Sequence, residues 1–502
     1  MNRVHDLLTD KPADDLAVID FDDTAYSYAQ LRDMSASLAR HLTKHGVRGG
    51  DRLVLVAENS AFYAASVFAA SLLDVWIILV NARQSPTEIQ AICDHSGART
   101  VLFTASVSEN ARTHAKRLNA QHIGDLPCGE ILVSPVVETT PEPVLQGPDQ
   151  VAALLYTTGT TSAPKGVMLT HGNLTFNAQN SAAFNRLQPD DLVLGVLPGT
   201  HIYCLASAFL PAMAAGGSMR FVPRFDPKEV LAHLRRGVTR FPAVPQMFAA
   251  IIELLDKSHE TLDAPTLRNL ATGGAPLDPD LKLRVQEVFG LPLNNGYGLT
   301  ETSPTVATTH NDAPRTDCSV GQAIPNVEVR VDQPNGDGIG EIQVRGPNVM
   351  KGYYHDPEKT AEVITSDRFF RTGDLGKIDP DGAIHIVGRL KELIIRSGFN
   401  VHPPEVEAML TRHPDVYQAA VIGRQVPGNE EILAFLITNG KTTEADLKSW
   451  LRDRFVAYKI PQHILIVDAY PTAATGKILK TRLISHFSDA LADRDRASAN
   501  AP

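Results

Sequence analysis

Helical and strand patterns of apolar residues alternate along the first third of the chain. Residues 28–46 place apolar side chains at helical spacing and stop at a glycine, which predicts a helix. Residues 52–57 (RLVLVA) form an apolar run of strand length. The alternation continues as a helix over 61–73, a strand over 76–80, a helix over 87–96 and a strand over 100–103. Strands that alternate with helices predict an α/β layered domain with a largely parallel sheet.

The pattern changes near Val320. Short strands are predicted over 327–331, 340–344 and 382–387, with Asn-Gly and Asp-Gly turn signals among them, which indicates an antiparallel β region attached to the α/β core. Beyond Arg389 a short α+β pattern begins. It predicts helices over 404–411 and 444–455 and strands over 418–422 and 432–437.

Composition narrows the class of protein. The 502 residues carry 47 Lys and Arg against 57 Asp and Glu, a formal net charge of −10, which gives no global attraction to nucleic acid or anionic membrane. The four cysteines are far apart, without a CxxC pair, so a reducing cytoplasm is expected. The most apolar stretch, residues 64–80, contains Asp74 and falls short of the roughly 20 residues that span a bilayer. No signal peptide and no membrane span are expected.

A hydroxyl-rich loop is the first candidate site. Residues 154–170 (LLYTTGTTSAPKGVMLT) run from an apolar strand into a loop that ends in Pro-Lys-Gly. Glycine lets backbone N–H groups approach a phosphate, and hydroxyls and a lysine add donors and charge. The spacing does not match a Walker A loop. The predicted phosphate loop comprises Thr157, Thr158, Gly159, Thr160, Thr161 and Lys165.

This loop resembles the phosphate loop of the adenylate-forming superfamily, which includes acyl-CoA synthetases, peptide-synthetase adenylation domains and firefly luciferases. Four more segments resemble the family in order: NGYGLTET at 295–302, RTGD at 371–374, GRLKE at 388–392 and PTAATGKIL at 471–479. The resemblance, strongest to 4-coumarate and fatty acid–CoA ligases, implies a large N-terminal domain (1–390) of two α/β subdomains plus a β-barrel. A small mobile α+β C-terminal domain (391–502) would follow.

The resemblance also implies roles for single residues. Lys477 is the adenylation lysine, whose charge offsets the repulsion between the substrate carboxylate and the α-phosphate of ATP. Thr300 contacts phosphate oxygens and Glu301 holds Mg²⁺, since a hard cation needs one carboxylate plus phosphate oxygens. Asp374 accepts the ribose hydroxyls, with Arg389 beside it. The remaining residues of the adenine and ribose site are Gly274, Ala275, Pro276, Asn295 and Tyr297, whose ring can stack on a purine.

The second half-reaction engages other residues by the same resemblance. Lys391 is the hinge about which the C-terminal domain rotates, and Gly398 lies on the face that approaches coenzyme A. Two positions depart from the family pattern. Ile395 stands where plant 4-coumarate–CoA ligases carry a lysine, and Ser162 stands where the phosphate loop usually has glycine.

Residues 200–205 (THIYCL) bear on the identity of the acid. They lack the aspartate of amino-acid-activating domains and resemble 4-coumarate and fatty acyl-CoA ligases. Tyr203, Gly273 and Gly296 would then form an apolar pocket for an aryl or alkyl chain, with His201 at the carboxylate end. A dicarboxylate ligase of the malonyl type is the alternative, although such enzymes carry an arginine where Gly296 stands.

The resulting hypothesis is an ATP-dependent acid–CoA ligase that forms an acyl-adenylate, with ATP, Mg²⁺, coenzyme A and a small carboxylic acid as its partners. A homodimer is left open. Residues 16–24 (LAVIDFDDT) also fit a haloacid-dehalogenase-type phosphatase, with Asp20 as nucleophile and Asp22 as acid/base, or else a simple hairpin. A third hypothesis is a non-catalytic adenylate-binding protein. The presence of four residues argues against it: Glu301, Asp374, Arg389 and Lys477.

Overall fold

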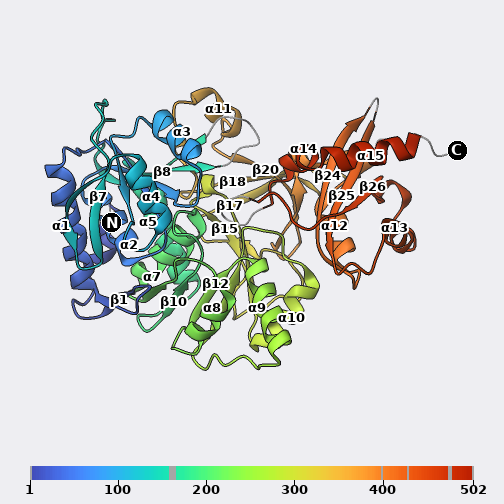
Figure 1. Ribbon diagram of the computed structural model, residues 1–502, viewed down its shortest axis with the longest axis horizontal. Coiled ribbons are helices and arrows are strands. Elements are labelled where there is room, and N and C mark those ends of the chain that lie inside the picture. Colours follow the sequence, from blue (N-terminus) through green and yellow to red (C-terminus); the bar gives the residue numbers. More distant parts are fainter. Residues whose placement is uncertain (1–2, 158–164, 397–398, 427–428, 473–477, 500–502) are drawn as a thin grey trace. The chain divides into compact units, whose positions relative to one another are not determined.

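The computed structural model describes residues 3–157, 165–396, 399–426, 429–472 and 478–499 (Figure 1). By their contacts, residues 1–330, 343–371 and 379–384 form one compact unit, and residues 331–342, 372–378 and 385–502 form another. The predicted domain boundary at residue 390 stays a prediction. Phosphate-loop residues Thr158, Gly159, Thr160 and Thr161, the coenzyme A-side Gly398 and the adenylation lysine Lys477 lie outside the described residues.

The first sheet has eight strands in the order β19-β9-β8-β4-β3-β5-β7-β6. Its central strands β8, β4, β3 and β5 pair in parallel, while β9 and β19 add antiparallel strands at one edge and β7 and β6 at the other. The strands are β3 (Arg52–Ala57), β4 (Trp76–Asn81), β5 (Thr100–Phe103), β6 (Gln121–Leu126), β7 (Gly129–Val133), β8 (Val151–Thr157), β9 (Lys165–Thr170) and β19 (Gly352–Tyr353).

The second sheet has nine strands in the order β16-β15-β14-β13-β12-β10-β11-β1-β2. The run from β14 to β1 is parallel, with antiparallel strands at both edges. The strands are β1 (Leu16–Ile19), β2 (Ala25–Ser27), β10 (Leu192–Gly195), β11 (Ser218–Phe221), β12 (Arg240–Ala243), β13 (Asn269–Thr272), β14 (Leu293–Gly298), β15 (Thr305–Thr308) and β16 (Gln322–Ala323).

Helices cover both faces of these sheets, which explains why β3 is apolar on both faces from Leu53 to Ala57. Leu53 and Leu55 of β3 face a core that the two sheets share, while Val54 and Val56 face a separate core with α3 and α4. Helix α2 lies in the shared core and buries all but its last residue, so it is apolar on every side. The helices of this unit are α1 (Tyr28–Lys44), α2 (Ala61–Leu72), α3 (Pro86–Ser96), α4 (Glu109–Arg117), α5 (His171–Phe184), α6 (Ile202–Cys204), α7 (Leu210–Ala215), α8 (Pro227–Leu234), α9 (Pro245–Ser258), α10 (Pro279–Phe289) and α11 (Pro357–Val363).

The β region predicted near Val320 is a four-stranded sheet in the order β17-β18-β20-β21. The C-terminal α+β pattern is also present, as a β22-β23 hairpin and a three-stranded sheet in the order β24-β25-β26. These strands are β17 (Glu328–Asp332), β18 (Gly340–Arg345), β20 (Phe370–Ile378), β21 (Ile384–Arg389), β22 (Ile394–Arg396), β23 (Phe399–Val401), β24 (Val416–Val426), β25 (Asn429–Thr438) and β26 (His463–Ile466). The helices are α12 (Pro403–Thr411), α13 (Glu444–Arg452), α14 (Leu483–His486) and α15 (Ser488–Ala499).

No helix among the described residues combines the length and apolarity that a membrane crossing requires.

Candidate active site

The carboxyl ends of the parallel strands in the nine-stranded sheet gather several of the predicted residues. Strand β10 leads toward residues 200–205, β13 ends just before Gly273, and β14 carries Asn295, Gly296 and Tyr297. Because parallel neighbours end at one edge of a sheet, the segments after them lie together. Ligands of α/β proteins bind at such edges.

The three residues predicted to form the acid pocket lie close together. A Cβ atom built on Gly273 would lie 3.7 Å from Cζ of Tyr203 and 3.0 Å from the carbonyl oxygen of Gly296. The ring of Tyr203 also reaches to 4.0 Å from a Cβ built on Gly274, so small residues and one aromatic ring share this space. Burial raises the pKa of Tyr203, which keeps its hydroxyl neutral. Nδ1 of the exposed His201 accepts the backbone N–H of Tyr203 at 3.2 Å, which fixes the start of α6.

The turn after β14 presents Thr300 and Glu301, which belong to the short 3₁₀ turn η4 (Thr300–Thr302). A Cβ at Gly298 would lie 1.9 Å from the carbonyl oxygen of Pro304, so only glycine fits where the chain turns back. The Glu301 carboxylate accepts a hydrogen bond from the hydroxyl of Tyr353 at 2.9 Å.

The other predicted nucleotide residues of this unit are also placed. Tyr297 is half-buried on β14, Ala275 is half-buried, and Gly274 and Pro276 are exposed. The side-chain amide of Asn295 donates to the carbonyls of Cys318 at 2.9 Å and Ser319 at 3.3 Å, so it holds that segment against β14.

The two ends of the phosphate loop are held opposite each other. Thr157 at the end of β8 pairs with Lys165 at the start of β9 in antiparallel register. The loop therefore leaves and re-enters the sheet at neighbouring positions.

In the other unit, the predicted ribose residues form an ion pair. Nε of Arg389 lies 3.0 Å from Oδ1 of Asp374, whose side chain is 5% exposed. The backbone N–H of Asp374 donates to Oγ1 of Thr372 at 3.0 Å. The predicted hinge residue Lys391 is exposed in the 3₁₀ turn η5 (Leu390–Glu392).

The described residues on both sides of Lys477 are anchored within the same unit. Thr472 and Ile478 form an antiparallel bridge. Nζ of Lys480 lies 2.8 Å from Oε1 of Glu407 and 3.3 Å from Oε2 of Glu392.

Magnesium together with a nucleotide fits the residues around Glu301. Within the described part of the chain, no cluster of three or more histidine, cysteine and acidic side chains is arranged to hold a metal ion. A nucleotide-borne Mg²⁺ takes one or two carboxylates plus substrate phosphates, and Glu301 beside the phosphate-loop strands offers such a carboxylate.

The Asp20 and Asp22 pair builds a hairpin turn. The buried Asp20 accepts the backbone N–H groups of Ala61 at 3.0 Å and Phe21 at 2.9 Å, and burial raises its pKa to about 6. Asp22 accepts the N–H of Thr24 at 3.0 Å. The turn joins the antiparallel strands β1 and β2, as the hairpin interpretation predicts.

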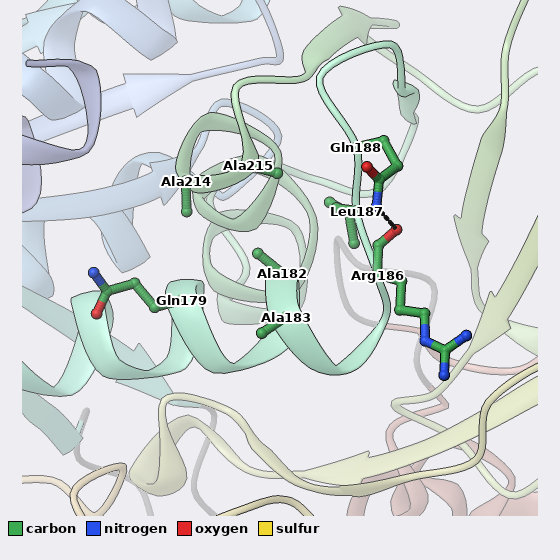
Figure 2. Close-up of a pocket in the computed structure, with 8 residues that line it drawn as sticks. All are labelled: Gln179, Ala182, Ala183, Arg186, Leu187, Gln188, Ala214 and Ala215. Carbon is green, nitrogen blue, oxygen red and sulfur yellow. Dashed lines mark hydrogen bonds between the residues drawn. The ribbon is translucent and has the colours of Figure 1, made fainter. Parts of the chain in front are cut away.

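A shallow depression lies elsewhere, between α5, α7 and the loop after α5 (Figure 2). None of the predicted site residues lines it. In Figure 2, the Gln188 side chain folds back onto its own loop by donating to the Arg186 carbonyl at 3.2 Å.

Comparison with known proteins identifies the family of the chain. The AMP-binding enzyme family matches residues 7–354, and its C-terminal domain matches residues 405–477. A feruloyl-CoA synthase from an Amycolatopsis species is 36% identical over 476 residues, covering 92% of this chain and 94% of the relative. ATP-bound MatB from Rhodopseudomonas palustris superposes with a TM-score of 0.85 at 30% identity, covering 98% of this chain and 100% of that one. o-Succinylbenzoate CoA synthetase from Bacillus subtilis, in complex with an acyl-adenylate intermediate, gives a TM-score of 0.81 at 28% identity, covering 96% and 98%.

The chain belongs to the AMP-binding enzyme family, in the acyl-CoA synthetase branch of the adenylate-forming superfamily. The predictions of family, fold class and enzyme class are confirmed. Tyr353, whose hydroxyl contacts the Glu301 carboxylate, is not among the site residues predicted from the sequence. A Gly-Tyr-Tyr triplet at 352–354 was its only sequence signal.

Proposed function

We propose that this enzyme joins an aromatic carboxylic acid to coenzyme A at the expense of ATP. The observation that carries the proposal is the similarity to feruloyl-CoA synthase along 92% of the chain. The packing of Tyr203 against Gly273 and beside Gly274 supports it, because glycines leave room for a flat ring that an aromatic wall can contact.

In the first step a carboxylate oxygen of the acid attacks the α-phosphorus of ATP, and pyrophosphate leaves. Lys477 would bridge the two anions as their charges approach. Lys165 and the hydroxyls of the phosphate loop would hold the triphosphate. Glu301 would hold Mg²⁺, which when bound neutralises part of the phosphate charge.

In the second step the thiol sulfur of coenzyme A attacks the acyl carbon, and AMP leaves with the oxygen that joined it to the acid. The C-terminal domain would turn about Lys391 between the steps, so that Gly398 replaces Lys477 at the acyl group. Asp374 and Arg389 would hold the ribose, and Tyr297 with Gly274, Ala275 and Pro276 would hold the adenine. His201 would lie at the carboxylate end of the acid.

A panel of acids tests this proposal. The purified enzyme is supplied with ATP, Mg²⁺ and coenzyme A together with cinnamic, coumaric, ferulic, decanoic or malonic acid, and thioesters are measured by mass spectrometry. We expect the highest kcat/KM with a cinnamic-type acid. Preference for malonate would support the dicarboxylate alternative, and failure with every acid would support a non-catalytic adenylate-binding protein. The cytoplasmic location and the homodimer stay predictions from the sequence.

A further inference from the structure

A short segment, residues 346–354, is hydrogen-bonded both to the turn of Glu301 and to β9, the strand that follows the phosphate loop. We refer to this segment as the strap. The backbone N–H of Met350 donates to the carbonyl of Glu301 at 2.8 Å. The next N–H, of Lys351, donates to the carbonyl of Met168 on β9 at 3.0 Å, and β19 continues the strap as an antiparallel partner of β9. The strap therefore contacts both the turn of Glu301 and strand β9, the two elements proposed to flank the triphosphate.

The strap is fixed from its other side as well. The side-chain amide of Asn173, near the start of α5, donates to the carbonyls of Pro347 at 2.7 Å and Val349 at 3.0 Å. The fully buried Asn348 donates to the carbonyl of Thr305 at 2.9 Å. Gly352 has φ +148°, and a Cβ there would lie 2.9 Å from Cγ2 of Thr360, so the strap packs too closely for a larger residue. A segment held at this many points has little freedom to shift.

Two adjacent tyrosines of the strap face opposite sides, as strand residues do. The hydroxyl of Tyr353 donates to Oε1 of Glu301 at 2.9 Å, whereas that of Tyr354 donates to Oε1 of Glu142 at 2.7 Å. Both rings are buried, at 8% and 4% exposure. The two bonds have the same chemistry, but only the first reaches the candidate active site.

The hydroxyl of Tyr353 supplies a single hydrogen-bond donor to the Glu301 carboxylate. A neutral hydroxyl offers one proton, which Oε1 of Glu301 accepts. The second carboxylate oxygen keeps its lone pairs for another partner.

We propose that Tyr353 is a positioning residue that orients the Glu301 carboxylate toward the divalent cation carried by ATP. This inference rests on the proposed function of Glu301. A free glutamate side chain must lose its rotamer freedom when it binds a cation, whereas a carboxylate already held by a buried hydroxyl has lost it during folding. Residues that orient a metal ligand in this way typically change metal affinity by about 10- to 100-fold when removed.

The test compares Tyr353→Phe with Tyr354→Phe, each of which deletes one oxygen from the same strap. The Kd of Mn²⁺·ATP is measured by the electron paramagnetic resonance signal of bound and free Mn²⁺, and the Kd of ATP is measured in excess EDTA. Tyr353→Phe should weaken Mn²⁺·ATP binding by about 10- to 100-fold and leave metal-free ATP binding unchanged. Tyr354→Phe should change neither. Equal effects of the two substitutions, or an equal loss of metal-free ATP binding, would overturn the proposal.

A double-substitution cycle separates positioning from a general loss of stability. In a Glu301→Gln background, Tyr353→Phe should cause no further loss of Mn²⁺·ATP affinity, because its effect passes through the carboxylate. A full additional loss would contradict that path. The acid panel tests the proposed function independently of this cycle. If the proposed function is wrong, the unsubstituted enzyme forms no thioester with any acid, regardless of how the two tyrosine variants bind Mn²⁺·ATP.

Discussion

At the scale of single residues, the size of the predicted acid pocket can be tested at a glycine where the protein itself has space for a side chain. A Cβ at Gly296 would lie 3.5 Å from Oγ1 of Thr308 and 3.6 Å from the carbonyl oxygen of Thr272. These are ordinary van der Waals distances, so the protein itself accommodates a methyl group there. A methyl group at this position should therefore weaken activity only by contacting the bound acid.

Gly296→Ala should therefore reduce kcat/KM for a cinnamic-type acid by about 10- to 200-fold, the usual range for one methyl group in a pocket. Propionate, which leaves the depth of the pocket empty, should lose little. Steady-state rates of AMP formation give, for each acid, the ratio of kcat/KM between the unsubstituted enzyme and the variant. An equal loss with both acids would place Gly296 outside the acid pocket.

A second residue-scale effect concerns stability and pH. The imidazole of His171 is fully buried, and its Nδ1 accepts the backbone N–H of Val4 at 3.1 Å. Burial, helped by the positive charge of Arg3, lowers its pKa from 6.5 to about 3. Below pH 6.5 the imidazole of His171 is protonated in the unfolded chain but stays neutral in the folded chain. The free energy of unfolding that this residue contributes therefore falls as the pH falls toward about 3.

His171→Asn keeps an acceptor for Val4 but cannot take up that proton. Between about pH 6 and pH 4 the unfolding free energy of the unsubstituted protein should fall more steeply than that of the variant, by about 1.4 kcal/mol per pH unit. Urea denaturation at several pH values measures both slopes. Parallel slopes would show that His171 is protonated in the folded protein.

At the scale of secondary-structure elements, the start of α5 supports more than its own helix. Thr170 and Asn173 cap the helix reciprocally, with Oδ1 of Asn173 accepting the N–H of Thr170 at 2.9 Å. The amide nitrogen of the same asparagine holds the strap through two carbonyls. One side chain thus connects a helix end to the segment that braces Glu301.

Asn173→Ala should lower the unfolding free energy by about 2–4 kcal/mol, because it leaves several buried backbone groups without partners. The matched control is Asn180→Ala on the same helix, where one exposed amide donates to the Pro325 carbonyl at 2.7 Å. That change should cost less than about 1 kcal/mol. Urea midpoints compare the two variants. Similar midpoints would mean that the strap does not depend on Asn173.

Elements with a strong periodic pattern were predictable from the sequence. The strand at 52–57 matches β3, and the helix expected over 28–46 ends slightly earlier, at Lys44, because Gly46 takes φ +99°. Strand β19 has two residues and no period of its own. Its conformation comes from pairing with β9, nearly two hundred residues earlier, so local pattern cannot reveal it.

The same distinction applies to the candidate site. Motifs such as NGYGLTET predict residues near a nucleotide because each motif is contiguous in the sequence, and that assignment stays a prediction. The hydrogen bond from Tyr353 to Glu301 joins residues 52 positions apart, and the proximity of Tyr203 to Gly273 brings together segments that follow different strands. Such contacts follow from sheet order, which one sequence does not specify.

At the scale of the whole molecule, a substitution at Lys477 should slow the first half-reaction without slowing the second. Lys480 and the bridge between Thr472 and Ile478 hold the described residues around it, so a change at position 477 leaves those anchors in place. Lys477→Ala should slow acyl-adenylate formation by at least about 10²- to 10³-fold and leave thioester formation from supplied acyl-adenylate nearly unchanged. Single-turnover kinetics of each half-reaction measures both rates. Equal losses would refute this division of labour.

The most direct test of the central claim follows the oxygen atoms of the acid. A cinnamic-type acid labelled with ¹⁸O in both carboxylate positions is converted to its thioester, and the AMP released is analysed by mass spectrometry. Attack of the carboxylate on the α-phosphorus predicts that each AMP carries one ¹⁸O atom and that pyrophosphate carries none. Unlabelled AMP, or release of ADP in its place, would contradict an acyl-adenylate intermediate.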